Sequence, residues 1–286
     1  MSNRLVLFGD SFVNIVCEDV IPWWQLLAKR LKRVPIRYGY AGISRSFLYR
    51  EFCQYRQHNY DPNDRIIWVQ PVFGRAPTNH PDFPAEWANK MGPFYSQDYL
   101  RFKEKSHLPR DFPDSVTEHY TKYKGFYQNL DLLGDWENTT QYFVYSTLAS
   151  LPNPVTVIET NAMKQTRLSW QSSQFELPLP ENSRNFQHVT QKPLADIAHQ
   201  ELNPFSIQDL FDLYGHEPRT CHLGRTNNQR VSTAVYEVIR TGDPKPYEEF
   251  VFKTGLDPKE NRREFSRISG KRISDDAFRP QHFRTP

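Results

Sequence analysis

Cysteine and glycine are scarce in this chain, which has 3 Cys and 12 Gly among its 286 residues. Cys17, Cys53 and Cys221 are odd in number and far apart in the sequence. Such a set predicts neither a disulfide framework nor a zinc site with paired thiolate ligands. The 9 histidines are also scattered, without the close spacing that is typical of metal ligands. We therefore expect no bound metal.

Glycine-rich motifs for nucleotides are missing as well. The chain has no Gly-x-Gly-x-x-Gly pattern and no phosphate-binding loop that ends in Gly-Lys-Ser or Gly-Lys-Thr. It also lacks the Gly-x-Ser-x-Gly elbow that holds the nucleophile in another class of serine hydrolases. These absences argue against a nucleotide cofactor, and we expect no cofactor of any kind.

The chain also has no long hydrophobic run and no large excess of charge of one sign. The apolar run near the N-terminus covers residues 5–8 only, and no later run approaches the length that spans a membrane. We expect no cleavable export signal and no membrane partner. Lys and Arg number 36 and Asp and Glu 33, for a net charge of +3, and they are interspersed. A nucleic-acid surface needs a concentrated basic patch, so we expect no nucleic-acid partner.

Short buried strands alternate with amphipathic helices in the first part of the chain. Apolar runs predict strands at 5–8, 34–38, 66–69 and 155–158. Apolar residues at helical spacing predict helices at 22–32 and 44–57. Strand–helix–strand repeats of this spacing imply right-handed crossovers and a parallel sheet that is covered on both faces. We therefore expect an α/β fold whose ligands bind at the carboxyl ends of the strands.

Other parts of the chain break this alternation. Residues from about 76 to 152 are first rich in proline and aromatics and then helical, at 120–133 and 136–151, which indicates a helical insertion or lid. Residues 164–191 are polar with little periodicity and are interpreted as a loop. Helices are expected again at 205–214 and 231–239. We assign residues 1–240 to one domain with this insertion, and 241–286 to a charged tail that wraps the domain or docks on a partner.

Candidate chemistry lies at the ends of the expected strands. Ser11, in Phe8-Gly9-Asp10-Ser11-Phe12, follows the first strand, so its hydroxyl is expected at the carboxyl edge of the sheet. Gly42 follows the second strand, where a backbone N–H can point toward an oxyanion. The structural alternatives are a plain strand-to-loop turn at Ser11 and a glycine turn with Ser44 as N-cap. His222 precedes the last helix, where an imidazole can meet a hydroxyl from the first strand.

These segments resemble the SGNH (GDSL-like) hydrolase superfamily. Gly9-Asp10-Ser11 is similar to the family's first block, which carries the nucleophile. Gly42 matches the glycine whose N–H lines the oxyanion hole, and His222 matches the general base of the last block. The phrases FGDSF, VQPVFGR and CHLGRTNNQRV look like those of divergent members encoded by bacteriophages. The resemblance covers residues 4–75 and 205–240, and it implies a flavodoxin-like three-layer sandwich with a mostly parallel sheet.

The chain departs from the family pattern at two positions. The family has an asparagine after the third strand as an oxyanion donor, whereas this chain reads Val-Gln-Pro-Val-Phe-Gly-Arg, in which Gln70 or Arg75 is the substitute. The family's acid stands three residues before the histidine, and that position here is Arg219. Glu217, Asp212 or a backbone carbonyl is left to orient the imidazole.

The resemblance implies a serine esterase. Ser11 would attack an ester carbonyl, His222 would take its proton, and Asp10, Gly42, Gln70 and Arg75 would bind the oxyanion or substrate. The expected substrate is an O-acetyl or other acyl ester, such as one on a polysaccharide, and the expected location is the host cytoplasm or the virion. The alternative, favoured by the two departures, is a phage structural or accessory protein that keeps the fold, has lost the activity and binds other virion proteins.

Overall fold

The computed structural model describes residues 3–14, 21–38, 43–71, 130–160, 180–202 and 223–255. The strands are β1 (Arg4–Phe8), β2 (Val34–Tyr38), β3 (Arg65–Gln70), β4 (Val155–Glu159) and β5 (Phe186–Val189). The helices are α1 (Ser11–Asn14), α2 (Trp23–Leu31), α3 (Arg45–His58), α6 (Leu130–Ala149), α8 (Leu194–Leu202), α10 (Arg225–Thr241) and α11 (Lys245–Glu248).

All strands pair in parallel in one sheet, in the order β2-β1-β3-β4-β5. This arrangement confirms the expected α/β fold with a parallel sheet. The chain runs outward from β1 to β2 and then returns past β1 to β3, so the direction of winding reverses between β1 and β3. In doubly wound sheets ligands bind at this switch point, outside the carboxyl ends of the strands. Ser11 follows β1 directly and therefore lies at this edge.

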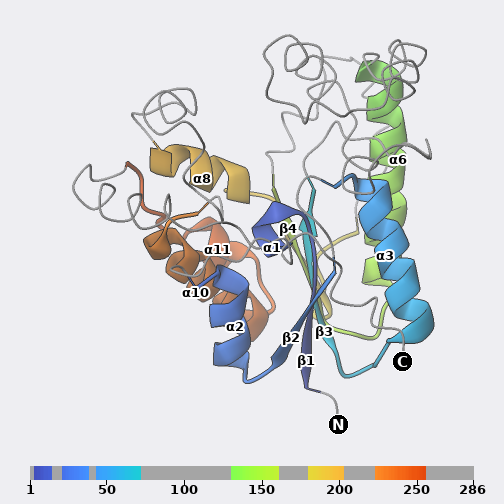
Figure 1. Cartoon of the computed structure of the whole chain (residues 1–286), viewed down its shortest axis with the longest axis horizontal. Coiled ribbons are helices and arrows are strands. Elements are labelled where there is room, and N and C mark those ends of the chain that lie inside the picture. Colours follow the sequence, from blue (N-terminus) through green and yellow to red (C-terminus); the bar gives the residue numbers. More distant parts are fainter. Residues whose placement is uncertain are drawn as a thin grey trace, which may run out of the picture.

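Helices cover both faces of the sheet, because successive side chains of a strand point to opposite sides. Leu5 and Leu7 of β1 pack in the core with α2, α8, α10 and α11, whereas Val6 and Phe8 pack in the core with α3 and α6. Figure 1 shows these two helical layers on either side of the sheet. The three-layer arrangement that was expected is thus present in the described part of the chain.

Local signals explain where two of the helices begin. Ser44 is the N-cap of α3, as the sequence predicts, and its Oγ accepts a hydrogen bond from the N–H of Phe47 at 3.2 Å. Helix α2 follows Pro22, which has no side chain that can cap the helix. The first N–H of α2, on Trp23, donates instead to Oδ1 of Asn228 at 2.8 Å. A residue of α10 therefore caps α2 and locks the two helices together.

The structure differs from the sequence expectations in the second half of the chain. Residues 186–189, expected in a loop, form the edge strand β5, all of it buried. The loop assignment was wrong there because polar Gln187 and His188 conceal the strand, although both are hydrogen-bonded in the interior. Two helices were expected within 120–151, but α6 continues unbroken through Gly134. Val144, Tyr145 and Leu148 of α6 pack on the sheet beside α3. The last part of the expected insertion therefore belongs to one of the two helical layers that cover the sheet.

Part of the expected tail is folded onto the domain. Tyr247, in α11, is fully buried, and Phe252 is 8% exposed. Both belong to the core cluster that also holds Val231 and Val235 of α10. The side chain of Asn227 fastens this segment, because it exchanges hydrogen bonds of 3.0 and 2.8 Å with the backbone of Lys253.

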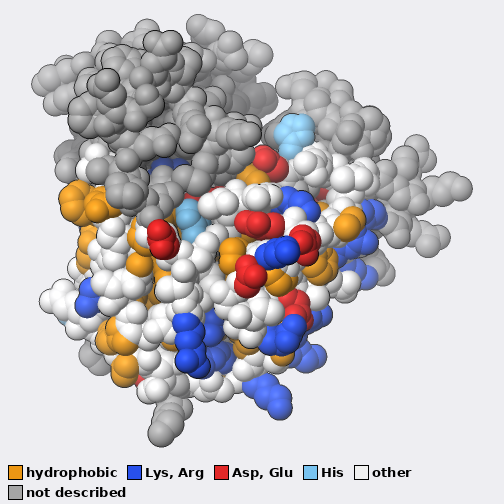
Figure 2. Space-filling model, turned by 180° about the vertical axis from the view of Figure 1, so that it is seen from behind, with side chains coloured by type: hydrophobic (Ala, Val, Ile, Leu, Met, Phe, Trp, Pro, Cys, Tyr) orange, Lys and Arg blue, Asp and Glu red, His pale blue; other side chains and the backbone are white. Residues whose placement is uncertain are grey.

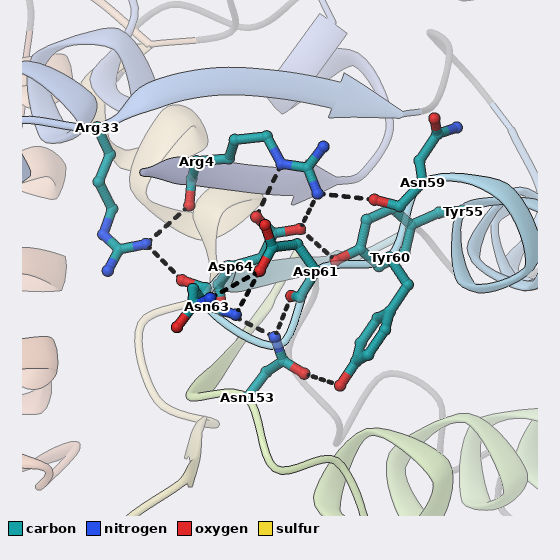
Figure 3. A network of polar contacts seen from close by, with 9 residues as sticks. All are labelled: Arg4, Arg33, Tyr55, Asn59, Tyr60, Asp61, Asn63, Asp64 and Asn153. Carbon is teal, nitrogen blue, oxygen red and sulfur yellow. Dashed lines mark hydrogen bonds and ion pairs between the residues drawn. The ribbon is translucent and has the colours of Figure 1, made fainter. Parts of the chain in front are cut away.

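A polar network closes the amino edge of the sheet, opposite the edge that carries Ser11 (Figure 3). Asp64 is fully buried and accepts from Arg4 through both oxygens, at 2.8 and 2.6 Å, and from the Tyr55 hydroxyl at 2.7 Å. Asn153 joins the network by donating to the carbonyls of Asp61 and Asp64. The network ties β1, α3 and the loops before β3 and β4 together, which is a structural role.

The visible surface carries charges of both signs. Acidic and basic side chains lie side by side on the face shown in Figure 2, with further basic ones toward its lower edge. Among the helices that the structure describes, none combines the length and the apolar character that a membrane crossing requires.

Candidate active site

Ser11 begins the short helix α1 after the turn Gly9-Asp10, which follows the inner strand β1. Gly9 allows this turn, because a Cβ there would lie 2.5 Å from Cγ2 of Val13 and 3.0 Å from Cβ of Val69. The N–H of Gly9 still donates to the carbonyl of Tyr38 at 3.1 Å, so β1 is held against β2 up to the turn. The turn is thus rigidly placed, and Ser11, which is 8% exposed, lies at the carboxyl edge of the sheet.

Asp10 stabilises the turn that carries Ser11. Its Oδ1 accepts a hydrogen bond from the N–H of Phe12 at 3.2 Å, and its carbonyl accepts from the N–H of Val13 at 3.0 Å. This is an Asx-type turn, in which an aspartate side chain binds the backbone two residues on. Asp10 is fully buried, and its role in the strand-to-loop turn explains its presence in the Gly-Asp-Ser motif. A contact of Asp10 with substrate stays a prediction.

A chain of hydrogen bonds connects the segment after Ser11 with the start of α10. The indole Nε1 of Trp23 donates to the carbonyl of Phe12 at 3.0 Å, and the N–H of Trp23 donates to Oδ1 of Asn228 at 2.8 Å. Nδ2 of Asn228 then donates to the carbonyl of Leu223 at 2.8 Å. All of these bonds are buried. Phe12, which follows Ser11, and Leu223, which follows His222, are therefore linked through the side chains of Trp23 and Asn228.

Gln70 ends β3, the strand beside β1. Its Oε1 accepts a hydrogen bond from the indole of Trp68 at 2.7 Å. The side chain's only donor is the amide Nε2. Nε2 is buried and has no partner among the described residues, and the same holds for Oγ1 of Thr160, just after β4. Gln70 shares its face of the sheet with Trp68, toward α3 and α6, whereas Phe12 and Val13 of α1 pack on the other face. The ends of β1 and β3 are adjacent, but the side chain of Gln70 lies on the face opposite to Phe12 and Val13.

A second polar cluster lies on the α3 and α6 side of this edge, and the sequence did not indicate it. Glu159 is the last residue of β4, and its Oε1 accepts from the hydroxyl of Tyr145 at 2.6 Å and contacts Nε2 of His188 at 2.7 Å. Each of the three is at most 5% exposed. Arg45 and Gln141 extend the cluster with a bond of 2.9 Å. The signal that could have revealed Glu159 is a charged residue directly after the apolar run 155–158.

Burial and the neighbouring carboxylate determine the protonation of Tyr145. Burial, with the charge of Glu159 as a further cause, raises the pKa of the Tyr145 hydroxyl well above its ordinary value. The phenol therefore stays protonated and donates to Glu159. Because the cluster lies on the side of α3 and α6, opposite to α1, it holds α6 and β5 to the sheet rather than joining the surroundings of Ser11.

Another buried carboxylate lies on the same side of the sheet as α1. Glu201, near the end of α8, is 2% exposed, and its Oε2 accepts a hydrogen bond from the N–H of Gly224 at 2.8 Å. Gly224 is the N-cap of α10. Sequence reasoning missed Glu201 because α8 was not expected, although Leu194, Ile197 and Ala198 mark a core-facing stripe on which Glu201 is the next position.

The remaining sequence-derived site residues, Gly42, Arg75, Asp212, Glu217 and His222, lie outside the described residues. Within the described ranges, no group of three His, Cys, Asp or Glu side chains could hold a metal ion.

Comparisons with family models, with curated proteins and with solved structures found nothing that matches this chain.

Proposed function

We propose that the chain is a serine esterase of the SGNH type, with Ser11 as nucleophile and His222 as general base. The observation that carries the proposal is the placement of Ser11 at the switch point of a doubly wound parallel sheet. A serine there is fixed by Gly9 and Asp10 at the edge where such sheets bind their ligands. The strand order is also the flavodoxin-like one that the resemblance implies.

The hydrogen-bond chain through Trp23 and Asn228 supports the pairing of Ser11 with His222. Phe12 and Leu223 are the sequence neighbours of the two proposed groups, and Trp23 and Asn228 join their carbonyls. The start of α10 is thereby held against the end of β1. His222 directly precedes Leu223 in the sequence, so this link supports its pairing with Ser11.

The reaction follows from these roles. The Oγ of Ser11 attacks the ester carbonyl carbon while His222 takes the hydroxyl proton. N–H groups of Ser11 and Gly42 stabilise the oxyanion. The tetrahedral intermediate then expels the alcohol, which receives the proton from His222. Water hydrolyses the acyl-serine by the same steps. The substrate class is an O-acetyl or other acyl ester, such as one on a phage host's polysaccharide.

Hydrolysis of p-nitrophenyl acetate and labelling by a fluorophosphonate test this proposal. Ser11→Ala should lower the rate by at least about a thousandfold, because loss of a catalytic nucleophile leaves only residual catalysis. Mass spectrometry should place the phosphonate on the peptide that contains Ser11, and His222→Ala should slow the labelling. Ser232→Ala is the matched control, since Ser232 is a buried serine of α10 whose hydroxyl has no partner among the described residues.

A hydrolysis rate that survives Ser11→Ala, or a wild-type chain that the phosphonate does not label, would contradict the proposal. The second of these results would favour the alternative of a phage structural or accessory protein that retains the fold. Arg219 at the position of the family's acid and the absence of the family's asparagine after the third strand are the features that motivate this alternative.

A further inference from the structure

Arg65 is a cation whose charge no described residue balances. It is the first residue of β3 and pairs with Leu5 of β1. Its side chain is half-buried, and its Nη1 is shielded from solvent without a hydrogen-bond partner among the described residues. An unpaired charge away from water is costly, and a buried polar atom without a protein partner often binds a water molecule or an ion. The position of Arg65 therefore favours an anion beside it.

Arg33 brings a second positive charge to the same place. Its Nη1 donates to the carbonyl of Arg4 at 2.9 Å and to the carbonyl of Asn63, two residues before Arg65, at 3.0 Å. Figure 3 shows this nitrogen turned to the two carbonyls, while the other end of the guanidinium points away from the network. Burial, with the like charge of Arg33 as the second cause, lowers the pKa of Arg65 to about 10. Both guanidiniums are therefore cationic at neutral pH.

The acids that are nearest in the sequence are committed to other partners. Asp64 directly precedes Arg65, but both oxygens of its carboxylate accept from Arg4. Asp61 accepts from the backbone and from the side chain of a neighbouring asparagine. Among the residues that the structure describes, no carboxylate forms an ion pair with Arg33 or Arg65. The two positive charges are thus left without a counter-charge in this part of the chain.

The two arginines lie at the amino edge of the sheet, on the face that α2 and α10 cover. Successive side chains of a strand alternate between faces, so Arg65 shares its face with Ile67, which packs in the core of that side. Arg33 follows the end of α2, whose last turn carries Lys29 and Arg30. The helix dipole accounts for cations at this end of α2, but it does not account for Arg65, which belongs to a strand. No acidic residue occurs at positions 23–33 that would offset these charges.

A phosphate group fits what these side chains provide. A guanidinium presents several N–H donors in one plane and binds the oxygens of a phosphate in pairs. Two cations match a dianion better than a single carboxylate does. Arg65 is partly exposed, so an anion can reach it from solution, and the two carbonyls already hold Arg33 in place. Little side-chain freedom is therefore lost when Arg33 binds the anion.

We propose that Arg33 and Arg65 form a binding site for a phosphate group. The site lies at the amino edge of the sheet, opposite the edge that carries Ser11, so it does not depend on the proposed esterase activity. The phosphate oxygens accept from Nη1 of Arg65 and from the outward-facing donors of Arg33. The bound dianion offsets the repulsion between the two cations, and binding therefore stabilises the folded chain.

A titration with sodium phosphate, followed by calorimetry at constant ionic strength, measures the binding. At about pH 7.5 the probe is mostly dianionic, and we expect a Kd of about 1 mM or lower. Arg65→Met keeps an apolar stem but removes the charge, and it should weaken binding by at least about tenfold. Arg50→Met is the matched control, because Arg50 is an exposed arginine of α3 that lies over the ring of Phe47. This control should bind phosphate as the wild type does.

The melting temperature in chloride tests whether the charge is balanced from within the protein. Because Arg65→Met loses no partner, it should melt within about 2 °C of the wild type in sodium chloride. About 10 mM phosphate should raise the melting temperature of the wild type by about 3–5 °C more than that of Arg65→Met. Phosphate also stabilises proteins without binding to a site, and the response of Arg50→Met, which should equal that of the wild type, corrects for this effect.

Glycerol 1-phosphate distinguishes two sources of the phosphate group. Binding as tight as that of inorganic phosphate would assign the site to a phosphate monoester on a larger molecule. Binding of inorganic phosphate alone would assign it to the free ion, and either result supports the site.

Three results would overturn the proposal. A wild type that does not bind inorganic phosphate rejects the site, whatever the variants do. Equal affinity of the wild type and Arg65→Met shows that phosphate binds elsewhere. An Arg65→Met chain that melts far below the wild type in chloride shows that the protein itself balances the charge. If this variant does not fold, Arg65→Lys takes its place, and an affinity equal to that of the wild type would reject the paired binding by the guanidinium.

Discussion

At the scale of single residues, Gly9 shows how closely the turn at Ser11 depends on its surroundings. The contacts of a hypothetical Cβ with Val13 and Val69, at 2.5 and 3.0 Å, are shorter than side chains tolerate. A larger residue at position 9 must therefore move α1 away from β3. Since Ser11 begins α1, its hydroxyl would move with the helix.

Gly9→Ala should lower the free energy of unfolding by about 1–3 kcal/mol, as expected for overpacking in a core, and it should also slow phosphonate labelling of Ser11. Gly242→Ala is a suitable control. Gly242 ends α10 with φ of 74° and has open space around it, so alanine strains the backbone without a clash. That variant should be destabilised without a change in the labelling rate. Equal labelling of wild type and Gly9→Ala would show that the close approach does not position Ser11.

At the scale of secondary-structure elements, the helices on one face are coupled by side chains that bind backbone groups. Asn228 of α10 caps α2 through Trp23 and holds the carbonyl of Leu223, and Asn227 beside it holds the segment around Lys253. Two adjacent asparagines thus perform separate tasks. One of them connects elements near the proposed site, and the other secures the chain after α11.

Asn228→Ala should lower the free energy of unfolding by about 2–3 kcal/mol, because it leaves buried backbone groups of Trp23 and Leu223 unpaired. It should also slow the labelling of Ser11, since α2 and α10 are no longer joined at the end of β1. Asn227→Ala removes two hydrogen bonds to Lys253 and should destabilise the fold without this loss. Urea unfolding and the phosphonate labelling rate measure the two effects. Equal labelling rates for both variants would contradict the coupling.

Element boundaries show why polar residues misled the sequence interpretation. The helical pattern was recognised from Val231, yet α10 begins at Arg225, because Asn227 and Asn228 are polar in sequence and buried in the fold. His188 conceals β5 in the same way. Hydrophobic periodicity detects a buried face only where that face is apolar. A polar side chain that is satisfied by a distant backbone group carries no local signal of its burial.

At the scale of the whole molecule, burial of tyrosines determines how the fold responds to alkali. Burial raises the pKa of Tyr55, Tyr145 and Tyr247, and the carboxylates of Asp64 and Glu159 add to this for the first two. A phenol whose folded pKa is raised contributes stability that is fully present below the unfolded value of 10.0. That contribution is lost as the pH rises from there through the folded value.

We therefore expect the free energy of unfolding to be insensitive to these groups up to about pH 10 and to fall above it, by about 1.4 kcal/mol per pH unit for each such tyrosine. Urea titrations at pH 8, 10 and 11 measure this dependence. Tyr247→Phe should make the fall of the unfolding free energy above pH 10 less steep, by about 1.4 kcal/mol per pH unit. The substitution should otherwise be mild, because the Tyr247 hydroxyl makes only a long contact of 3.4 Å with the carbonyl of Lys192. A stability that stays level to pH 11 would refute the expectation.

The sequence by itself determined the α/β class, the early strands and the Gly-Asp-Ser turn, because contiguous residues encode buried strands and turns. Only the tertiary structure decided which polar groups meet: Glu201 with Gly224, Glu159 with His188, and Asn228 with Trp23. Such pairs join residues far apart in the chain, and their hydrogen bonds depend on how helices and strands pack rather than on any local pattern.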